Sequence, residues 1–507
     1  MEFTHVSQLD KRKKSDVVVL PFWKDQLSIH AASSLEVSFK EFLAPALTAG
    51  DFKGKEGEVL FLYLEGQPEQ RVALLGLGAQ EKLTVDSLRR AYGTLAKTCL
   101  SKKLKSVSLI IPQSELLSEQ FIVHGIAEGL LLPNYQFNQL KSVIDQENEE
   151  EGSLLQKINW IGISKEGLIE AEKVLTICDG VYYTRDLVNG NADDVTPQYL
   201  ALCAKGLAQE QPSIHTTIFD KKQLEKEKMG LILAVNRGSD LDPVLIQMEY
   251  KGNPQSSDHV VLIGKGITYD TGGLNIKPTG GMETMKCDMA GGAVCFGVIL
   301  VAAQLKLKVN LTVLIPSTEN SVDAKSFKPG DVYPSYSGKT VEMTNSDAEG
   351  RLILADALAY AVKKLQPTCL LDIATLTGAI EVALGSEASG VFSTHSDLAL
   401  GLIQAGESTQ ERLWQMPLYD EYKEKLKSDI ADLKSWNGRS GSSSVAATFL
   451  RHFVDPSIPW AHLDISGTAY VTEAKKYLPK YATGVGVRLI IEFLERLQPR
   501  STKKRAK

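Results

Sequence analysis

The sequence predicts an α/β protein with two domains, the larger and C-terminal of which contains a central mixed sheet flanked by helices. Three observations support this fold class. The 507 residues are too many for one ordinary hydrophobic core. Apolar runs of strand length alternate with helical stretches along the chain. A hydrophobic content of 43% and a charged content of 23% are typical of a globular protein.

Residues 1–165 are expected to form the smaller N-terminal α/β domain. The apolar run that begins at Val17 is interpreted as its first strand. A signal peptide would need a longer apolar segment, whereas Lys24 and Asp25 follow this run at once. The other elements expected here are strands at 59–64, 71–77, 106–111 and 159–164 and helices at 84–100 and 115–132.

Residues 166–189 are predicted to be a linking helix, and residues 190–507 the C-terminal domain. Thr196 and Pro197 have the chemistry of a helix start, with the threonine as N-cap and the proline in the first helical position. Later elements are expected as strands at 260–263, 311–315, 339–343, 369–373 and 460–465 and as helices at 291–305 and 352–365.

Composition limits the function classes. No apolar run approaches the roughly 18 residues of a membrane-spanning helix, so we expect a cytoplasmic protein without a membrane partner. A net charge of -6 gives no general attraction to nucleic acid. The six cysteines form no Cys-x-x-Cys pair, and the eight histidines include no His-Glu-x-x-His. Any metal would therefore be held by oxygen and amine ligands.

Two lysines and two aspartates follow the apolar run at 260–263, on segments interrupted by glycines. Lys265 lies between two glycines, and Asp270, Lys277 and Asp288 come after it. Open α/β sheets bind their ligands beyond the carboxyl ends of the strands. The pattern indicates a functional site, and a solvated loop with surface charges is the alternative.

A second acidic segment contains Asp347 and Glu349. In an extended segment this spacing points both carboxylates the same way. Ser346-x-x-Glu349 can equally be read as a capping box that opens the following helix. Four carboxylates gathered with Asp270 and Asp288 would repel one another unless cations lay between them. The two segments together therefore predict a metal site.

The donor types indicate which metals would bind. Hard oxygen ligands favour manganese or magnesium, and a nitrogen donor would admit zinc. A lysine supplies nitrogen only as the neutral amine, so the cations and burial must remove its proton. Lys265 suits this role. Lys277 is better suited to remain charged and to stabilise negative charge that develops beside the metals.

These segments resemble the leucyl aminopeptidase (cytosol aminopeptidase) family of two-metal exopeptidases over about residues 180–490. The most specific segment is Asn345-Ser-Asp347-Ala-Glu349-Gly-Arg351. Ser346 replaces the usual threonine and Tyr269 the common phenylalanine, but neither change removes a donor. The other matching segments are residues 185–189, 264–273, 276–278, 285–289, 372–378, 460–465 and 482–488.

The resemblance implies a macro-domain-like N-terminal domain and a catalytic C-terminal domain. It implies removal of the N-terminal residue, leucine and others, from peptides in the cytoplasm by a homohexamer. It also implies two divalent ions per subunit, manganese first and zinc or magnesium as alternatives, together with bicarbonate. The implied metal ligands are Lys265, Asp270, Asp288, Asp347 and Glu349. The implied catalytic pair is Lys277 and Arg351. The implied substrate contacts are Lys265, Asp270, Lys277, Asp288, Asp347 and Leu376.

The expected mechanism follows from these roles. A water between the two ions attacks the scissile carbonyl, and the neutral α-amine of the substrate binds one ion. Lys277 donates to the oxyanion, and Arg351 holds bicarbonate for proton transfer, because no histidine or further glutamate lies near the motifs. Two alternatives stay open. The basic residues at 11–14 and 503–507 would support an additional DNA-binding or recombination-accessory role, and the carboxylates would also suit a phosphoesterase.

Overall fold

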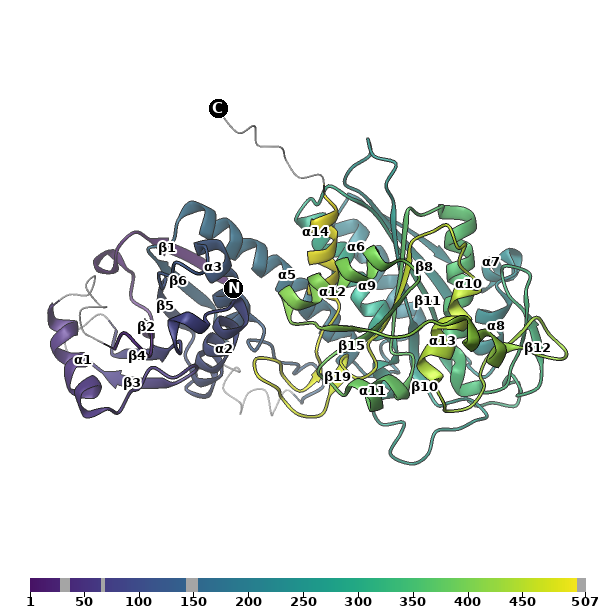
Figure 1. The fold of residues 1–507 in the computed structure, drawn as a ribbon, viewed down its shortest axis with the longest axis horizontal. Coiled ribbons are helices and arrows are strands. Elements are labelled where there is room, and N and C mark those ends of the chain that lie inside the picture. The colour runs from purple at the N-terminus through teal and green to yellow at the C-terminus, as the bar shows by residue number, and fades with distance from the viewer. Residues whose placement is uncertain (28–36, 65–68, 143–153, 499–507) are drawn as a thin grey trace. The chain divides into compact units, whose positions relative to one another are not determined.

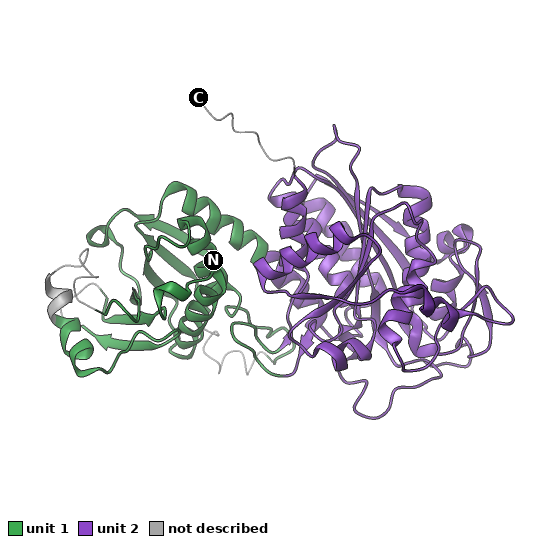
Figure 2. Cartoon of the chain, in the orientation of Figure 1, with its two compact units in different colours: residues 1–178, 473–480 green, residues 179–472, 481–507 purple. Residues whose placement is uncertain are grey.

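The computed structural model shows two compact units and describes residues 1–27, 37–64, 69–142 and 154–498 (Figure 1). Unit 1 comprises residues 1–178 and 473–480, and unit 2 comprises residues 179–472 and 481–507 (Figure 2). The division falls inside the long helix α5 (Lys165–Asn189), the helix expected to link the domains. Residues 473–480 pack with unit 1, whereas the sequence placed them in the C-terminal domain.

Unit 1 is built on a six-stranded sheet. Its strands are β1 (Glu2–Val6), β2 (Val17–Phe22), β3 (Val59–Tyr63), β4 (Arg71–Gly76), β5 (Ser106–Ile110) and β6 (Lys157–Ile161). The order across the sheet is β1-β6-β5-β2-β4-β3, and every neighbouring pair is parallel except β3 with β4. The run at Val17 is therefore a strand, as predicted, and its first three residues are fully buried.

Helices complete unit 1. They are α1 (Val37–Ala49), α2 (Val85–Ser101), α3 (Glu119–Leu131) and the first half of α5. Thr84 caps α2 in a capping box with Ser87. The returning segment 473–480 is fixed to this helix, since the hydroxyl of Tyr477 donates to Asp86 Oδ1 at 3.0 Å.

Unit 2 is built on a nine-stranded mixed sheet. Its strands are β7 (Ile214–Phe219), β8 (Val244–Lys251), β9 (Val260–Gly264), β10 (Gly266–Asp270), β11 (Asn310–Asn320), β14 (Cys369–Ala374), β15 (Ser389–Ser393), β16 (Leu413–Gln415) and β18 (Trp460–Asp464). The order is β16-β15-β18-β14-β9-β11-β8-β7, with β10 paired to β11. Strands β18, β14, β9 and β11 are parallel, so their carboxyl ends share one edge of the sheet.

Helices cover both faces of this sheet (Figure 1). Helix α9 (Ala290–Gln304) contacts β9, β11 and β14 on one face. Helix α10 (Glu349–Tyr360) shares a separate core with α8 (Gly230–Asn236) and α13 (Ser442–Arg451). The remaining helices are α6 (Pro197–Glu210), α7 (Lys221–Glu227), α11 (Gly378–Leu384), α12 (Ser396–Thr409) and α14 (Val487–Leu497). Two small sheets comprise β12 (Val332–Pro334), β13 (Thr340–Glu342) and β17 (Leu433–Lys434), and β19 (Tyr470–Val471) and β20 (Tyr481–Ala482).

The helices of unit 2 can be compared with two expectations from the sequence. Thr196 does cap α6, because its side chain accepts a hydrogen bond from Tyr199 N and Pro197 follows it. The helix expected at 291–305 forms as α9. The 3-10 turn Met285–Met289 runs directly into it, so that Met285–Gln304 together are long and apolar enough to cross a membrane, with a mean hydropathy of 1.6. Because 94% of this apolar stretch is buried inside the protein, the helix belongs to the protein core.

Candidate active site and metal centre

A cavity of about 270 Å³ lies at the edge of the central sheet where its parallel strands end. Lys265 follows β9, Thr375 follows β14, and Ser466 comes two residues after β18. The sequence predicted a site at this edge from the general behaviour of open α/β sheets. The lining residues are Lys265, Asp270, Lys277, Met285, Cys287, Asp288, Asn345, Asp347, Glu349, Arg351, Thr375, Leu376, Thr377, Gly378, Glu381, Trp436, Ser442 and Ser466.

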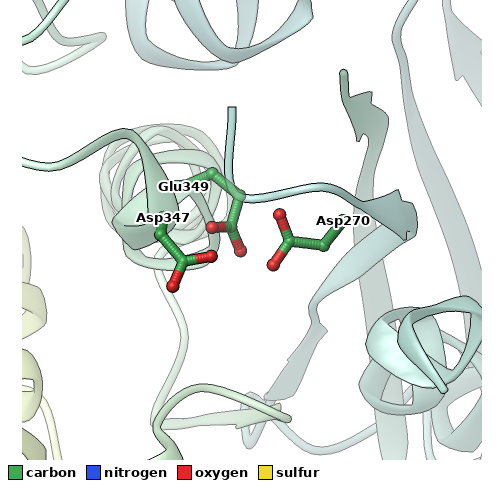
Figure 3. Close-up of side chains that lie close together, drawn as sticks. All are labelled: Asp270, Asp347 and Glu349. Atoms are coloured by element: carbon green, nitrogen blue, oxygen red, sulfur yellow. The ribbon is translucent and has the colours of Figure 1, made fainter. Parts of the chain in front are cut away.

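Three carboxylates converge in this cavity (Figure 3). Asp270 ends β10, Asp347 lies in a short 3-10 turn (Ser346–Ala348), and Glu349 begins α10. Each offers an oxygen atom within 4.8 Å of the others. Asp270 and Glu349 are both 2% exposed, so both carboxylates are shielded from solvent. A fourth carboxylate, Asp288, lines the same cavity from the 3-10 turn Met285–Met289.

Lys265 lies between two of these carboxylates. Its Nζ is 2.7 Å from Asp288 Oδ2 and 2.8 Å from Glu349 Oε1, and it donates to the carbonyl oxygen of Thr375 at 2.9 Å. Burial lowers the pKa of Lys265, but the negative charges of Asp288 and Glu349 outweigh it and raise that pKa above its ordinary range. Burial raises the pKa of Asp288. Burial also acts to raise the pKa of Glu349, but the lysine charges hold it below its usual value.

Lys277 joins the other two carboxylates. Its Nζ is 2.7 Å from Asp270 Oδ2 and 2.6 Å from Asp347 Oδ1. Burial raises the pKa of Asp347 to about 6, and Glu349 adds to this rise. Burial acts to lower the pKa of Lys277, but the surrounding carboxylates raise it above its ordinary value, so this lysine stays charged. Its side chain is 16% exposed against 3% for Lys265, which makes it the more accessible cation.

Neighbouring polar groups orient the carboxylates. Asp270 Oδ1 accepts hydrogen bonds from Gly272 N at 2.9 Å and from Asn320 Nδ2 at 2.8 Å. Asp288 Oδ1 accepts one from Thr375 Oγ1 at 2.8 Å. The sequence reading missed these roles of Asn320 and Thr375. Both residues stand at the carboxyl ends of strands, β11 and β14, and that position is the signal that could have identified them.

The second acidic segment adopts a different backbone from the extended one expected. Asp347 has φ -84° and ψ 16° in a 3-10 turn. The alternation of side chains in an extended strand therefore does not explain why Asp347 and Glu349 converge. The alternative capping box does not form either. Asn345 caps the turn by accepting from Asp347 N at 2.9 Å, while Ser346 Oγ donates to Gly272 O at 2.7 Å. This bond fixes the turn to the loop after β10, which brings Asp347 to the site.

Arg351 and Leu376 also line the cavity. Arg351 Nη1 donates to Ser435 O at 2.9 Å, whereas its buried Nε has no hydrogen-bond partner among the described residues. Burial lowers the pKa of Arg351 to about 10, so the guanidinium remains charged at neutral pH. The backbone N–H of Leu376 donates to Asp464 Oδ1 at 3.2 Å.

A further glutamate, Glu381, also lines the cavity, although the sequence reading expected none near the motifs. It lies one turn into α11, three residues after the lining residue Gly378. Residues three apart share one face of a helix, so both reach the cavity together. The helix begins directly after the Thr375-Leu376-Thr377 segment, and this spacing could have revealed Glu381 once α11 was recognised.

The donor set fits divalent cations. Four carboxylates supply the hard oxygen ligands that manganese and magnesium prefer, and the amine of Lys265 offers the nitrogen that suits zinc. Glu349 Oε2 is buried and makes no hydrogen bond with the described residues, which leaves it available as a ligand. Metal ions would relieve the repulsion among buried carboxylates.

Comparison with known proteins shows the same two-part organisation. The model of the cytosol aminopeptidase family catalytic domain matches residues 182–491, and the model of that family's N-terminal domain matches residues 19–143. A probable cytosol aminopeptidase of Protochlamydia amoebophila (strain UWE25) is 67% identical over 497 residues, covering 98% of this chain and 99% of the relative. The probable cytosol aminopeptidase of Chlamydia abortus (strain DSM 27085 / S26/3) is 44% identical and covers 97% and 99%.

Solved structures agree with this relationship. A mutant of tomato leucine aminopeptidase superposes with a TM-score of 0.86 at 30% identity, covering 98% of this chain and 96% of the neighbour. The bottromycin maturation enzyme BotP in complex with Mn gives a TM-score of 0.83 at 27% identity, covering 95% and 99%. These matches confirm the two-domain α/β fold. The chain belongs to the cytosol aminopeptidase family and is an aminopeptidase, a metal-dependent exopeptidase and hydrolase.

Proposed function

We propose that this aminopeptidase removes leucine and other first residues from peptides with a free N-terminus, using two divalent cations per subunit. The observation that carries the proposal is the convergence of four carboxylates and two lysines in one cavity. The proposed metal ligands are Lys265, Asp270, Asp288, Asp347 and Glu349, with Asp270 and Glu349 contacting both ions. Four of these five ligands are carboxylates, which supports manganese, with magnesium as an alternative. The nitrogen of Lys265 makes zinc a second alternative.

Bound divalent cations would lower the pKa of water and polarise the scissile carbonyl. The chain's own contribution begins with Lys277, the more exposed of the two lysines. Its ammonium is held by Asp270 and Asp347, so it can donate to the carbonyl oxygen as negative charge develops there. Such a donor typically contributes a factor of about 10²–10³ in turnover.

Lys265 and Arg351 have different proposed roles. Lys265 would serve as a ligand through its neutral amine, and its present contacts with Asp288 and Glu349 place Nζ among the other donor atoms. Arg351 would orient a small anion such as bicarbonate, because its guanidinium is charged, buried and incompletely hydrogen-bonded.

Substrate contacts are proposed for the residues that face the same cavity. Carboxylates beside the centre would accept hydrogen bonds from the α-amine, which accounts for the need for a free N-terminus. Leu376 would form part of the apolar wall for the substrate, with its backbone held by Asp464. The proposed substrate contacts are Lys265, Asp270, Lys277, Asp288, Asp347 and Leu376.

We propose a homohexamer in the cytoplasm as the working form. The names of the family and of the relatives support the location, and the hexamer is an expectation from the resemblance to the family. The DNA-binding alternative depends on two basic segments. In the first, Arg12 is paired with Glu69 and Lys11, Lys13 and Lys14 are exposed, and the second, 503–507, lies outside the described residues. The net charge of -6 argues against this alternative.

Metal removal tests the proposed function. Purified protein should contain two divalent ions per chain by elemental analysis and should hydrolyse leucine p-nitroanilide but not p-nitrophenyl phosphate. Dialysis against a chelator should abolish hydrolysis, and manganese should restore it. Full activity in metal-free protein would contradict the proposal, and turnover of the phosphate ester alone would favour the phosphoesterase reading.

A further inference from the structure

Glu381 is a carboxylate of the cavity that the proposed metal centre does not use. Its side chain is exposed and makes no hydrogen bond or ion pair with any residue that the structure describes. Each of the other carboxylates in the lining lies within 2.8 Å of a lysine Nζ; these are Asp270, Asp288, Asp347 and Glu349. Glu381 is therefore the lining carboxylate whose charge is available to a ligand.

The space beside Glu381 is open and partly apolar. Gly378 lies on the same face of α11, and a Cβ added there would meet no atom within 4 Å. Met285 and Leu376 contribute apolar surface to the same cavity. A long side chain entering here could pack its methylene groups on this surface and bring its tip to the carboxylate.

The first side chain of a substrate is directed to this wall by the proposed mechanism. In the proposed mechanism Lys277 donates to the scissile carbonyl oxygen. Because Asp270 and Asp347 are paired with Lys277, the α-amine on the neighbouring carbon would lie on the side of Asp288. Met285 precedes Asp288 by three residues in one 3-10 turn, where side chains three apart are eclipsed. Thr375, which hydrogen-bonds to Asp288, leads directly into α11. The side chain that branches between amine and carbonyl would then face Met285, Gly378 and Glu381, which line the same cavity.

On the basis of the proposed function, we propose that Glu381 selects peptides whose first residue is lysine or arginine. Their side chains combine a methylene stem with a charged head, which matches an apolar wall that ends in a free carboxylate. Hydrogen bonds between an ammonium or guanidinium and a carboxylate are stronger than neutral ones. A leucine side chain uses only the apolar part of this wall.

Paired substrates test this selectivity. We would measure kcat and KM for arginyl, lysyl and leucyl p-nitroanilides with wild type, Glu381→Gln and the control Glu407→Gln. Glu407 is an exposed glutamate on α12 and is absent from the cavity lining. We expect the arginine-to-leucine ratio of kcat/KM to fall about tenfold in Glu381→Gln, mainly through KM. The ratio should not change in Glu407→Gln.

Two further measurements add independent readouts. Glu381→Lys should reverse the preference, so that a glutamyl substrate gains on the arginyl one. In wild type, raising the salt concentration should reduce the arginine-to-leucine ratio, because a partly exposed ion pair is screened.

An unchanged ratio in Glu381→Gln would overturn the inference, and so would an equal loss on all substrates, which would indicate a structural role. Wild type that cleaves leucyl but neither arginyl nor lysyl substrates would also overturn it and would leave the proposed function intact. Wild type that cleaves none of them with metals bound would instead refute the proposed function.

Discussion

Gly350→Ala is the substitution that probes the packing around Lys265 most directly. A Cβ at Gly350 would lie 2.5 Å from Lys265 Cε, 2.6 Å from Nζ and 2.8 Å from Cδ. Carbon atoms in contact are about 3.5–4.0 Å apart, so the end of Lys265 must move by roughly 1 Å. Because the atoms that must yield belong to the end of a flexible side chain, the fold should survive.

The displacement should have a large effect on activity and a small one on stability. Alanine is favoured over glycine within a helix by about 0.5–1 kcal/mol, which offsets part of the crowding in α10. Moving Lys265 Nζ by about 1 Å stretches its contact with Asp288 or Glu349 from 2.7 or 2.8 Å to beyond hydrogen-bond length, and a misplacement of this size can reduce kcat/KM by about 100-fold. The cation that this lysine holds should bind more weakly.

The assay compares kcat/KM, metal content and Tm of Gly350→Ala with those of Gly206→Ala. Gly206 lies within α6, and a Cβ there would meet no atom within 4 Å, so this control should keep full activity and gain slightly in stability. A Gly350→Ala protein with full activity and both metals would refute the reasoning. A variant that fails to fold would show that the strain falls on the backbone of α10.

Three further predictions follow from the site and from unit 1. Lys277→Ala should keep both metals while turnover falls by about 10²–10³, and loss of metal in elemental analysis would show a structural role instead. Asp347→Asn should lower metal content and activity together, so a fully active variant would exclude the ligand role. In unit 1, burial acts to lower the pKa of His124, but Glu128 and Glu170 raise it to about 9. Because the pKa of His124 is raised on folding, the protonated histidine stabilises the folded state by at most about 3 kcal/mol. This contribution is complete below pH 6.5 and is lost as the pH rises through 9. Urea unfolding of wild type and His124→Gln should therefore differ at pH 6 and converge above pH 10, and a constant difference would contradict this assignment.

The position of the site could be predicted because it depends on local signals. The apolar run at 260–263 forms β9 as expected, and Lys265, between two glycines, separates β9 from β10, which stays in the sheet by pairing with β11. The structure brings Lys265, Asp270 and Asp288 into one cavity, as their shared placement after strands indicated. Their roles as metal ligands remain a prediction.

Features that depend on distant contacts could not be predicted. The turn at Asp347 is fixed by the bond from Ser346 to Gly272, 74 residues away, and no local propensity reports that bond. β1 is paired with β6, some 150 residues later, and was not recognised as a strand. Residues 473–480 belong to unit 1 through contacts such as that of Tyr477, which sequence order conceals.

The most direct test of the metal centre is a manganese anomalous difference map from crystals of the protein grown with MnCl₂. The account predicts two peaks in the cavity, one of them within bonding distance of Lys265 Nζ and both contacting Asp270 and Glu349. A map without peaks there, with both lysines still paired to the carboxylates at saturating manganese, would contradict it.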